Sequence, residues 1–441
     1  MSAFKAYDIR GIYNKDFDKD TAYRIGFFLK DLFGAKSIAV GRDCRLSSDE
    51  IFEYLTKGIT DSGCDVVDLG LTTTPMTYFA AFEKGFETAV MITASHNPKN
   101  YNGFKISGPN AVPVGKESGL ADLEKWVNEK DVSVSVNKGK ITSLDIKNEY
   151  IKFMKEKIAD ISSLNFAVDC SNGSSAVISK EIFGDKAIYL NDVPDGNFPG
   201  HSPNPMMESA RKDLKACVKE NALDIGIIFD GDADRVMFLD NKGKYISPDL
   251  ILCVLANALI EEEGECVVMD IRSSKAVYYY VKELLAEPII WKVGHAYAKA
   301  KIRETGALFG GELAGHYYFK DFGCCDSGVL AAIYVLNTLA EFKEDGYEIA
   351  DIIKEFSVFA SSGELNFKTD NKDEIIKKVT RHYKKKDYIK FYDFDGIRYE
   401  FDEWWFNMRK SNTEPYLRLV VEAKDKKMLE EKIEELKKFI I

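Results

Sequence analysis

Short apolar runs rich in β-branched residues recur along most of the chain, and each is followed by a polar turn and a stretch of helical character. Such alternation indicates βαβ units and a mainly parallel sheet. Three sets of three strands are predicted: residues 37–41, 65–69 and 89–92; residues 165–169, 187–190 and 225–229; and residues 266–270, 288–291 and 307–309. This internal repeat predicts three similar α/β domains with mixed, mainly parallel sheets, at residues 1–143, 144–246 and 247–357.

The pattern changes in the last part of the chain, residues 358–441. A strand is predicted at residues 364–368 and a helix at residues 372–386, followed by β-rich stretches without crossover helices. An amphipathic helix at residues 427–441 ends the chain. This order predicts a C-terminal α+β domain with an antiparallel sheet, and the Ser-Ser-Gly stretch 361–363 is the expected hinge linker before it.

Composition and charge narrow the class of protein. A chain of 441 residues is too long for one core, and its 45% hydrophobic and 30% charged residues are typical of a soluble globular protein. No apolar run is long enough to span a bilayer, and the N-terminal segment lacks the apolar stretch of a signal peptide, so a cytoplasmic protein without membrane contact is expected. The net charge of −11 argues against nucleic acid as a partner, and a phosphate site must therefore gather its positive charge locally.

The third strand of each set runs into a polar loop. The serine loop, residues 93–98, reads Thr-Ala-Ser-His-Asn-Pro, and the aspartate loop, residues 230–235, reads Asp-Gly-Asp-Ala-Asp-Arg. The glutamate loop, residues 310–316, reads Gly-Gly-Glu-Leu-Ala-Gly-His. Ligand sites in open α/β sheets lie beyond the carboxyl ends of the strands. Three equivalent loops on three similar domains are therefore expected to face one cleft.

The serine and aspartate loops together predict a phosphoryl-transfer site. Ser95 can carry phosphate, and Arg235 can neutralise phosphate oxygens. Three carboxylates at alternate positions suit a hard cation such as Mg²⁺: Asp230, Asp232 and Asp234. Lys105, one strand beyond the serine loop, is expected to return to the site as a cation or a proton-transfer group.

Each of these two loops also has a simpler interpretation. A serine in a turn most often bonds its own backbone, and an acidic turn can simply be solvated. A calcium loop is excluded because its sixth position is Arg235 and its twelfth is Asn241. The sequence has no Gly-x-Ser-x-Gly elbow of an esterase, no Walker A motif and no Gly-x-Gly-x-x-Gly after a strand, so neither acyl transfer nor nucleotide chemistry is indicated.

Two further segments are candidate ligand sites. In the glutamate loop, Glu312 can accept hydrogen bonds from two vicinal sugar hydroxyls, although a plain glycine-rich turn is the alternative. Three of the five histidines in the chain fall in candidate site loops: His96, His295 and His316. The basic turn, residues 409–415, carries the arginine, serine, asparagine and threonine donors that a phosphate dianion needs, and an ordinary turn is again the alternative.

With these four segments in order, the sequence resembles the α-D-phosphohexomutase family, and most of all its phosphomannomutase/phosphoglucomutase branch. The resemblance extends over essentially the whole chain and implies four domains around a central cleft. It implies a phosphorylated Ser95 and a Mg²⁺ ion held by the serine phosphate and the three aspartates. It also implies that Arg235 contacts the phosphoserine, and that Lys105 and His96 transfer protons or support that transfer. Arg10, in the N-terminal signature Lys-Ala-Tyr-Asp-Ile-Arg-Gly, is expected to reach the same site.

The resemblance assigns substrate binding to residues from several parts of the chain. These are Tyr7, Arg272, His295, Glu312, Ala314, His316, Arg409, Ser411, Asn412, Thr413 and Arg418. Two of them depart from the pattern of the branch. Ala314 stands where serine is common, which removes a hydroxyl donor, and Arg272 stands where some relatives have lysine. Both departures leave the preferred sugar open and do not affect the reaction type.

The reaction implied by the resemblance is the reversible interconversion of hexose 1-phosphate and hexose 6-phosphate, with mannose and also glucose as the sugar. It would pass through a phosphoserine enzyme and a hexose 1,6-bisphosphate, which also serves as activator. Phosphoglucosamine mutase, a phosphoserine-dependent sugar phosphatase and a non-catalytic sugar-phosphate binding protein remain alternatives. The expected partners are small-molecule sugar phosphates, and the expected assembly is a monomer or a homodimer.

Overall fold

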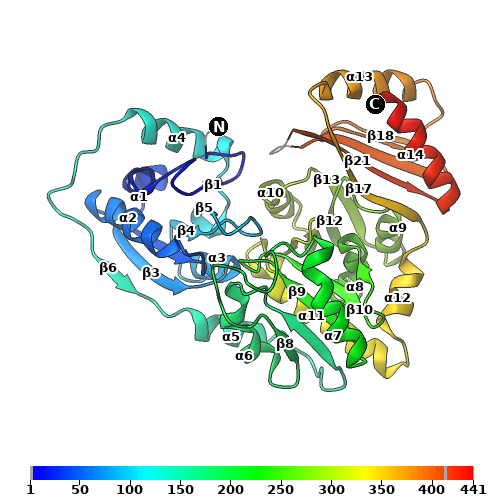
Figure 1. Ribbon diagram of the computed structural model, residues 1–441, viewed down its shortest axis with the longest axis horizontal. Helices are drawn as coiled ribbons and strands as arrows, with labels where there is room; N and C mark the ends of the chain where they lie inside the picture. The colour runs from blue at the N-terminus through cyan, green and yellow to red at the C-terminus, as the bar shows by residue number, and fades with distance from the viewer. Residues whose placement is uncertain (1–2, 412–414, 441) are drawn as a thin grey trace.

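The computed structural model describes residues 3–411 and 415–440, which form four domains in chain order (Figure 1). Domain 1 has a sheet of six strands, and each of the other three domains has a sheet of five. The domains follow one another in an arc, from the blue N-terminal domain at one end to the orange and red C-terminal domain at the other (Figure 1). Within the described ranges, no helix has both the length and the apolar character that crossing a bilayer requires.

The first two domains each combine parallel strands with helices. The elements of domain 1 are β1 (Ile9–Ile12), α1 (Lys19–Phe33), β2 (Ser37–Arg42), α2 (Ser48–Asp61), β3 (Asp65–Leu71), α3 (Thr74–Glu83), β4 (Thr88–Ile92), β5 (Tyr101–Ser107), α4 (Leu120–Glu129) and β6 (Ile141–Ser143). Those of domain 2 are α5 (Lys147–Lys155), β7 (Phe166–Asp169), α6 (Ser179–Phe183), β8 (Ile188–Leu190), α7 (Lys212–Glu220), β9 (Ile225–Phe229), β10 (Val236–Asp240) and β11 (Tyr245–Ile246).

Domain 3 has a mixed sheet, whereas the sheet of domain 4 is antiparallel. The elements of domain 3 are α8 (Pro248–Leu259), β12 (Cys266–Asp270), α9 (Lys275–Glu283), β13 (Glu287–Trp291), α10 (His295–Thr305), β14 (Phe309–Gly311), β15 (Tyr317–Phe319), β16 (Cys325–Asp326), α11 (Gly328–Glu344) and α12 (Ile349–Phe356). Those of domain 4 are β17 (Ala360–Lys368), α13 (Lys372–Tyr383), β18 (Lys390–Tyr392), β19 (Ile397–Glu400), β20 (Trp404–Lys410), β21 (Tyr416–Ala423) and α14 (Lys426–Ile440).

Domains 1 to 3 repeat one strand arrangement. The first strand of each set lies between the second and the third and is parallel to both, as in β2 with β3 and β4, β7 with β8 and β9, and β12 with β13 and β14. The next strand then returns antiparallel to the third: β5 on β4, β10 on β9 and β15 on β14. The serine, aspartate and glutamate loops are these three return turns. The predicted α/β repeat, with a loop at the end of each third strand, is confirmed.

The third strand of domain 3 begins two residues later than the sequence pattern predicts. Its predicted range was 307–309, whereas β14 covers Phe309–Gly311. Gly310 and Gly311 pair with Val268 and Met269 of β12, so the glycines belong to the ladder and not to the turn. A Cβ atom on Gly311 would lie 2.6 Å from the end of the Leu252 side chain, so a larger residue here would have to displace this side chain of α8.

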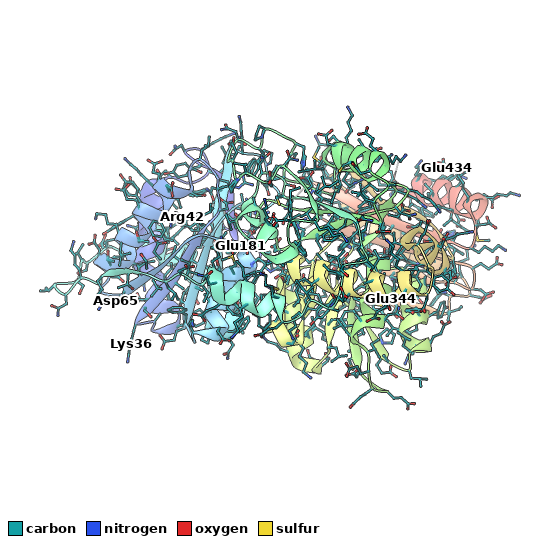
Figure 2. The ribbon with its side chains drawn as sticks, turned by 90° about the horizontal axis from the view of Figure 1, so that it is seen from below. Lys36, Arg42, Asp65, Glu181, Glu344 and Glu434 are labelled. Atoms are coloured by element: carbon teal, nitrogen blue, oxygen red, sulfur yellow. The ribbon has the colours of Figure 1, made fainter. Side chains whose placement is uncertain are left out.

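The two faces of the domain 1 sheet have different partners. Helices α1, α2 and α4 cover one face and form an apolar core with β2, β3 and β4. Gly26 of α1 and Gly58 of α2 each face the backbone of the other helix. A Cβ atom at either position would lie 2.0 Å from a carbonyl oxygen, so the two glycines allow the helices to approach closely. Helix α3 covers the opposite face, and its Met76 and Phe79 belong to a second core that continues into domains 2 and 3. Charged side chains such as Lys36, Glu181 and Glu434 lie exposed on the outside (Figure 2).

Domain 4 has the predicted antiparallel sheet, in the order β17-β21-β20-β19-β18, with a core of its own. The predicted hinge linker at residues 361–363 is wrong, because these residues are part of β17. Ser361 pairs with Glu422 of β21, and the register shifts between Ser361 and Glu364. Gly363 has a φ of 61°, which is the left-handed conformation of a β-bulge. The Ser-Ser-Gly stretch therefore bends an edge strand and does not form a free linker.

Candidate functional site

The serine loop brings its hydroxyl directly to the aspartate loop. Ser95 is 1% exposed and has a left-handed backbone with a φ of 51°. Its amide donates to Thr93 Oγ1 at 2.9 Å, and its hydroxyl donates to Asp230 Oδ2 at 2.7 Å. A non-glycine residue in this conformation, buried beside a carboxylate, is the kind of strained position that is frequent at functional sites.

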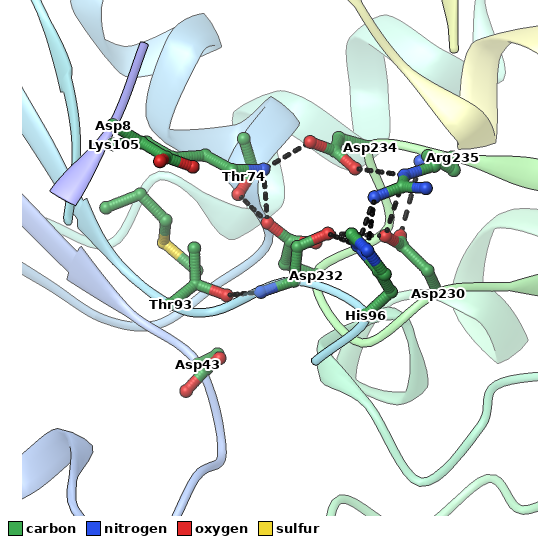
Figure 3. Close-up of polar contacts among 12 residues, drawn as sticks. Asp8, Asp43, Thr74, Thr93, His96, Lys105, Asp230, Asp232, Asp234 and Arg235 are labelled. Atoms are coloured by element: carbon green, nitrogen blue, oxygen red, sulfur yellow. Dashed lines mark hydrogen bonds and ion pairs between the residues drawn. The ribbon is translucent and has the colours of Figure 1, made fainter. Parts of the chain in front are cut away.

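The three aspartates form one buried carboxylate cluster (Figure 3). One oxygen from each of Asp230, Asp232 and Asp234 lies within 4.8 Å of the others. Burial raises the pKa of Asp230 well above its ordinary value, and the charges of the other two aspartates raise it further. Among the described residues, Asp232 Oδ1 and Asp234 Oδ1 are buried and accept no hydrogen bond. Unsatisfied buried carboxylate oxygens at this spacing fit a hard divalent cation.

Lys105 returns to this cluster from β5. Its Nζ lies 2.7 Å from Asp232 Oδ2 and also contacts Asp234 Oδ2. Burial lowers the pKa of Lys105, but the charges of Asp232 and Asp234 outweigh burial and raise the pKa above its ordinary value. The ammonium group therefore keeps its proton and neutralises part of the carboxylate charge. Thr74, at the start of α3, donates from its hydroxyl to Asp232 Oδ2 at 2.5 Å.

Arg235 and His96 close the other side of the cluster (Figure 3). Arg235 Nε lies 3.5 Å from Asp230 Oδ2, and Arg235 Nη2 contacts His96 Nδ1. Burial lowers the pKa of His96 well below its ordinary value, and the charges of Arg235 and Arg10 add to this effect. His96 is therefore neutral and accepts the arginine proton donor. Arg10 Nη1 donates to Asn97 Oδ1 at 2.9 Å, so the N-terminal signature reaches the serine loop as predicted.

The glutamate loop lies against the aspartate loop. The amide of Val236 donates to Gly315 O at 3.2 Å, and Arg235 and His316 form an antiparallel bridge. His316 Nδ1 lies 2.7 Å from Asp326 Oδ2. The other carboxylate oxygen, Asp326 Oδ1, lies 2.6 Å from Lys299 Nζ. Asp326 and Lys299 are both fully buried, so Asp326 is held in place by Lys299 and in turn holds the imidazole of His316 in one orientation.

The remaining predicted sugar-site residues surround Glu312. Glu312 Oε1 accepts from the amide of Gly294 at 2.5 Å, and burial raises the pKa of its carboxyl group. His295 follows Gly294, and its ring lies 5.7 Å from that of Tyr7. Burial, with the charge of Lys299, lowers the pKa of His295 to about 3. Ala314 lies partly buried in the same loop.

Three arginines meet one carboxylate between domains 3 and 4. Glu364 of β17 lies 2.8 Å from Arg418 Nη1, 3.0 Å from Arg272 Nη1 and 3.5 Å from Arg409 Nη2. Arg272 also pairs with Asp270, whose Oδ2 accepts from the amide of Leu313 at 2.8 Å. This chain of contacts joins the glutamate loop to the sheet of domain 4.

The predicted residues therefore fall into three groups. The first combines the serine and aspartate loops with Arg10 and Lys105, the second surrounds Glu312, and the third surrounds Glu364. The amide of Ser411 donates to Tyr416 O at 2.9 Å at the start of the basic turn. Asn412 and Thr413 lie outside the described residues.

Several residues of the first two groups were not predicted from the sequence. They are Asp43, Arg45, Thr74, Lys299 and Asp326. Arg45 follows β2, the parallel neighbour of the strand that ends in the serine loop, and Thr74 follows β3, the next parallel strand of the same sheet. The rule that ligand sites lie at the carboxyl ends of neighbouring strands would have pointed to them.

Comparison with known proteins identifies the class. Family models described as phosphoglucomutase/phosphomannomutase match all four domains: alpha/beta/alpha domain I at residues 1–132, domain II at residues 148–243, domain III at residues 247–356 and the C-terminal domain at residues 364–438. The chain therefore belongs to the phosphoglucomutase/phosphomannomutase family, as the four sequence segments predicted. It is a phosphohexose mutase, an enzyme of the isomerase class in carbohydrate metabolism.

Individual relatives agree with this assignment over their whole length. A phosphomannomutase of Methanocaldococcus jannaschii is 36% identical over 450 residues, covering 100% of this chain and 98% of the relative. A phosphomannomutase/phosphoglucomutase of Pseudomonas syringae pv. tomato is 35% identical, covering 97% of this chain and 92% of the relative. The crystal structure of a phosphoglucomutase/phosphomannomutase family protein from Burkholderia thailandensis superposes with a TM-score of 0.89 at 30% identity, covering 99% of this chain and 96% of that one.

Proposed function

We propose that this enzyme interconverts the 1- and 6-phosphates of mannose, and of glucose as a second substrate, through a phosphoserine at position 95. The observation that carries the proposal is the position of the Ser95 hydroxyl. It is buried 2.7 Å from Asp230, in a cluster that combines three carboxylates with Lys105 and Arg235. Oxygen acceptors and cations packed around one hydroxyl are the components of a phosphoryl-transfer site.

The aspartate cluster fits a magnesium ion. The donor set is all oxygen, and two of its buried oxygens have no hydrogen-bond donor among the described residues. We propose that Asp230, Asp232 and Asp234 hold Mg²⁺ together with the phosphate on Ser95. A bound Mg²⁺ ion would stabilise the negative charge of the phosphoryl oxygens during transfer.

Each half-reaction exchanges one phosphate ester for another. In the first, the bond between phosphorus and Ser95 Oγ breaks, a bond between phosphorus and a sugar hydroxyl oxygen forms, and the hydroxyl proton is passed on to Ser95 Oγ. The second runs in the opposite direction from the other end of the sugar, so that the bond between phosphorus and Ser95 Oγ forms again and the proton of Ser95 passes to the sugar oxygen that is released. We infer that neutral His96, whose Nδ1 lies 3.2 Å from Ser95 Oγ and contacts Arg235 Nη2, supports this transfer by holding Arg235 beside the phosphoryl group. Arg235 and protonated Lys105 supply the fixed positive charge that balances the phosphoryl group.

The sugar end of the site supports two orientations of one intermediate. The first transfer produces a hexose 1,6-bisphosphate, which must turn so that its other phosphate reaches Ser95. We infer that Glu312 accepts hydrogen bonds from adjacent ring hydroxyls in either orientation. We infer that Arg409 and Arg418 bind the phosphate that is not being transferred, since their guanidinium groups are suited to a phosphate dianion.

The proposal is tested with mannose 1-phosphate and glucose 1-phosphate as paired substrates, primed with the bisphosphate. Ala314 offers no hydroxyl to distinguish epimers, and one misplaced hydrogen bond costs about 0.5–1.5 kcal/mol. We therefore expect activity on both sugars, with kcat/KM values within roughly a hundredfold of each other. A preference above roughly a thousandfold for glucosamine phosphate, with mannose phosphate inert, would contradict the proposed substrate, since it exceeds what one or two such contacts supply.

A second assay tests the phosphoryl carrier. Ser95→Ala should lose nearly all mutase activity and keep its fold, whereas the exposed Ser133→Ala should behave like the wild type. Mass spectrometry should locate phosphate on Ser95 after incubation with a hexose bisphosphate. Phosphate found only on another residue would exclude the phosphoserine pathway, and phosphate released as inorganic phosphate without sugar product would indicate a phosphatase.

A further inference from the structure

Arg45 lies behind the serine loop and contacts no carboxylate of the aspartate loop. It belongs to the connection between β2 and α2, and only 2% of its surface is exposed. We propose that Arg45 is a positioning residue that fixes the serine loop for phosphoryl transfer. This inference rests on the proposed function, because it concerns the rate at which Ser95 exchanges its phosphoryl group.

All five N–H donors of the Arg45 guanidinium group have acceptors. Four of the acceptors are backbone carbonyls in and just after the serine loop. Nη2 donates to Ser95 O and Asn97 O at 2.7 Å each, and Nη1 donates to Pro98 O at 2.7 Å and Tyr101 O at 3.1 Å. Nε donates to Asp43 Oδ2 at 3.1 Å. One side chain therefore ties together the backbone from Ser95 to the start of β5.

This pattern requires arginine. Guanidinium is planar and holds five donors in a fixed fork, whereas lysine carries three donors on one atom and cannot reach four separated carbonyls at once. The fork itself is anchored, because Asp43 accepts from Arg45 Nε and from Ser48 Oγ, the latter at 2.6 Å. The guanidinium group also lies 5.1 Å from the Phe198 ring of domain 2, which shields it from water.

The carbonyl of Ser95 is held from two sides. Arg45 Nη2 donates to it from domain 1, and Gly231 of the aspartate loop approaches from domain 2 so closely that a Cβ there would lie 2.6 Å from the same oxygen. These two contacts fix the backbone of Ser95 and with it the position of its Cβ, and the hydrogen bond from the hydroxyl to Asp230 selects the rotamer. Holding the carbonyl therefore also holds the hydroxyl at 2.7 Å from Asp230.

The consequence is specific to the transfer step. A displacement of about 1 Å of a reacting group costs on the order of a hundredfold in rate. The residues proposed to bind the sugar and its second phosphate, such as Glu312 and Arg409, lie in domains 3 and 4 and do not contact Arg45. Loss of the Arg45 hydrogen bonds should therefore lower kcat and leave KM nearly unchanged.

The test is the variant Arg45→Lys with Arg24→Lys as matched control. Arg24 also binds backbone carbonyls within domain 1, with Nε donating to Val127 O at 2.5 Å and Nη2 to Lys130 O at 2.5 Å, away from the serine loop. In steady-state assays, Arg45→Lys should lower kcat by roughly 30- to 100-fold and change KM by less than about threefold. Arg24→Lys should keep the wild-type kcat.

Single-turnover measurement isolates the step. Enzyme phosphorylated on Ser95 is mixed with a sugar monophosphate, and the loss of phosphoserine is followed. Arg45→Lys should slow this transfer by the same factor as kcat, and Asp43→Asn, which keeps Arg45 but leaves its anchor with one acceptor oxygen and no charge, should slow it by a smaller factor. In an Arg45→Ala variant, added guanidinium at millimolar concentration should recover part of the transfer rate, and ammonium should not.

The outcomes separate this inference from the proposed function. If wild-type enzyme carries phosphate on Ser95 and Arg45→Lys transfers it at the wild-type rate, the positioning role is wrong and the phosphoserine pathway stands. The positioning role would also be overturned if Arg45→Lys lowered kcat and the folded fraction in parallel, or if it raised KM and left kcat unchanged. If wild-type enzyme never carries phosphate on Ser95, the proposed function itself fails.

Discussion

Asp232 shows how much one residue of the site depends on several parts of the chain. Its carboxylate accepts from Thr74 of α3 and pairs with Lys105 of β5, both in domain 1, and its other oxygen has no donor among the described residues. Domain 1 thus supplies the groups that orient a carboxylate of domain 2. The free oxygen is the one available to a cation.

We therefore expect Asp232→Asn to weaken magnesium binding. For wild-type enzyme, Mg²⁺ at about 100 times its Kd should stabilise the folded state by about 2.7 kcal/mol, and the variant should gain much less at the same concentration. Chelator should abolish mutase activity and Mg²⁺ should restore it. Thermal unfolding with and without Mg²⁺ measures this, and the exposed Asp185→Asn serves as control. An equal Mg²⁺-dependent shift in both variants would show that the cluster is not the metal site.

His201 of domain 2 is a second residue whose environment fixes its charge. Nε2 lies 3.0 Å from Asp169 Oδ2 and Nδ1 lies 2.8 Å from Ser202 O, so both ring nitrogens face acceptors. Burial lowers the pKa of His201, but the hydrogen bond and charge of Asp169 outweigh burial and raise it. Two acceptors favour the imidazolium form, in which both nitrogens donate.

Because the pKa of His201 is higher in the folded state than in the unfolded state, the protonated imidazole stabilises the fold. This stabilisation is fully present below the pKa of the unfolded state, about 6.5, and is lost as the pH rises through the pKa of the folded state. His201→Gln should therefore lower the unfolding midpoint more at pH 5.5 than at pH 9. Thermal unfolding of both proteins at the two pH values measures the difference. Asp169→Asn should remove most of the pH dependence, and a larger loss at pH 9 than at pH 5.5 would contradict the assignment.

At the level of elements, the strands of domain 4 place like charges opposite each other. Arg409 of β20 pairs directly with Arg418 of β21, an arrangement that is unfavourable in a sheet unless an anion lies between the two groups. Glu364 of β17 supplies that anion in the structure. Burial raises its pKa, but the charges of Arg272, Arg418 and Arg409 outweigh burial and lower it, so the carboxylate stays ionised.

We expect Glu364→Gln to destabilise the protein by about 3 kcal/mol, because it leaves three guanidinium groups without their shared partner. Inorganic phosphate should recover more of the unfolding midpoint in the variant than in the wild type, since a phosphate dianion can take the place of the carboxylate. Glu374→Gln, which removes one partner of an exposed pair with Lys378, controls for the loss of a surface charge. Equal stabilisation of variant and wild type would show that phosphate does not take the place of the Glu364 carboxylate, and stabilisation of neither would show that the arginines are not a phosphate site.

The sequence predicts elements better than it predicts the contacts between them. The strands that end in the serine and aspartate loops are predicted from continuous apolar runs, because a strand that is buried on both faces carries apolar residues at successive positions. The Ser-Ser-Gly stretch was read as a linker because its residues are small and polar, although its pairing with Glu422 makes it a bulged edge strand. The sequence does not predict Arg45 and Asp326 as site residues, because at least one strand separates each of them from its partner in the chain. Only the fold brings the partners together.

At the scale of the whole molecule, the apolar cores divide the four domains unequally. One core runs without interruption through domain 1, domain 2 and domain 3, and includes Phe79, Tyr150 and Leu330. Domain 4 has a separate core. Its contacts with domain 3 include polar ones, in which Arg398 Nη1 donates to Ile271 O at 2.8 Å and Ser273 O at 2.9 Å. Separate cores joined by polar contacts favour relative movement of the two parts.

We therefore expect domain 4 to change its position when a hexose bisphosphate binds, while domains 1 to 3 stay together. Hydrogen exchange should change in residues 271–275 and 360–364, where domain 3 meets domain 4. The amide of Thr74, which donates to Asp232 O at 3.0 Å between domains 1 and 2, provides the internal reference and should keep its protection. Small-angle scattering should show a smaller radius of gyration with ligand. Unchanged exchange and dimensions would mean that the ligand binds to a rigid molecule, and Arg409 and Arg418 would then have to reach the sugar phosphate from where they already lie.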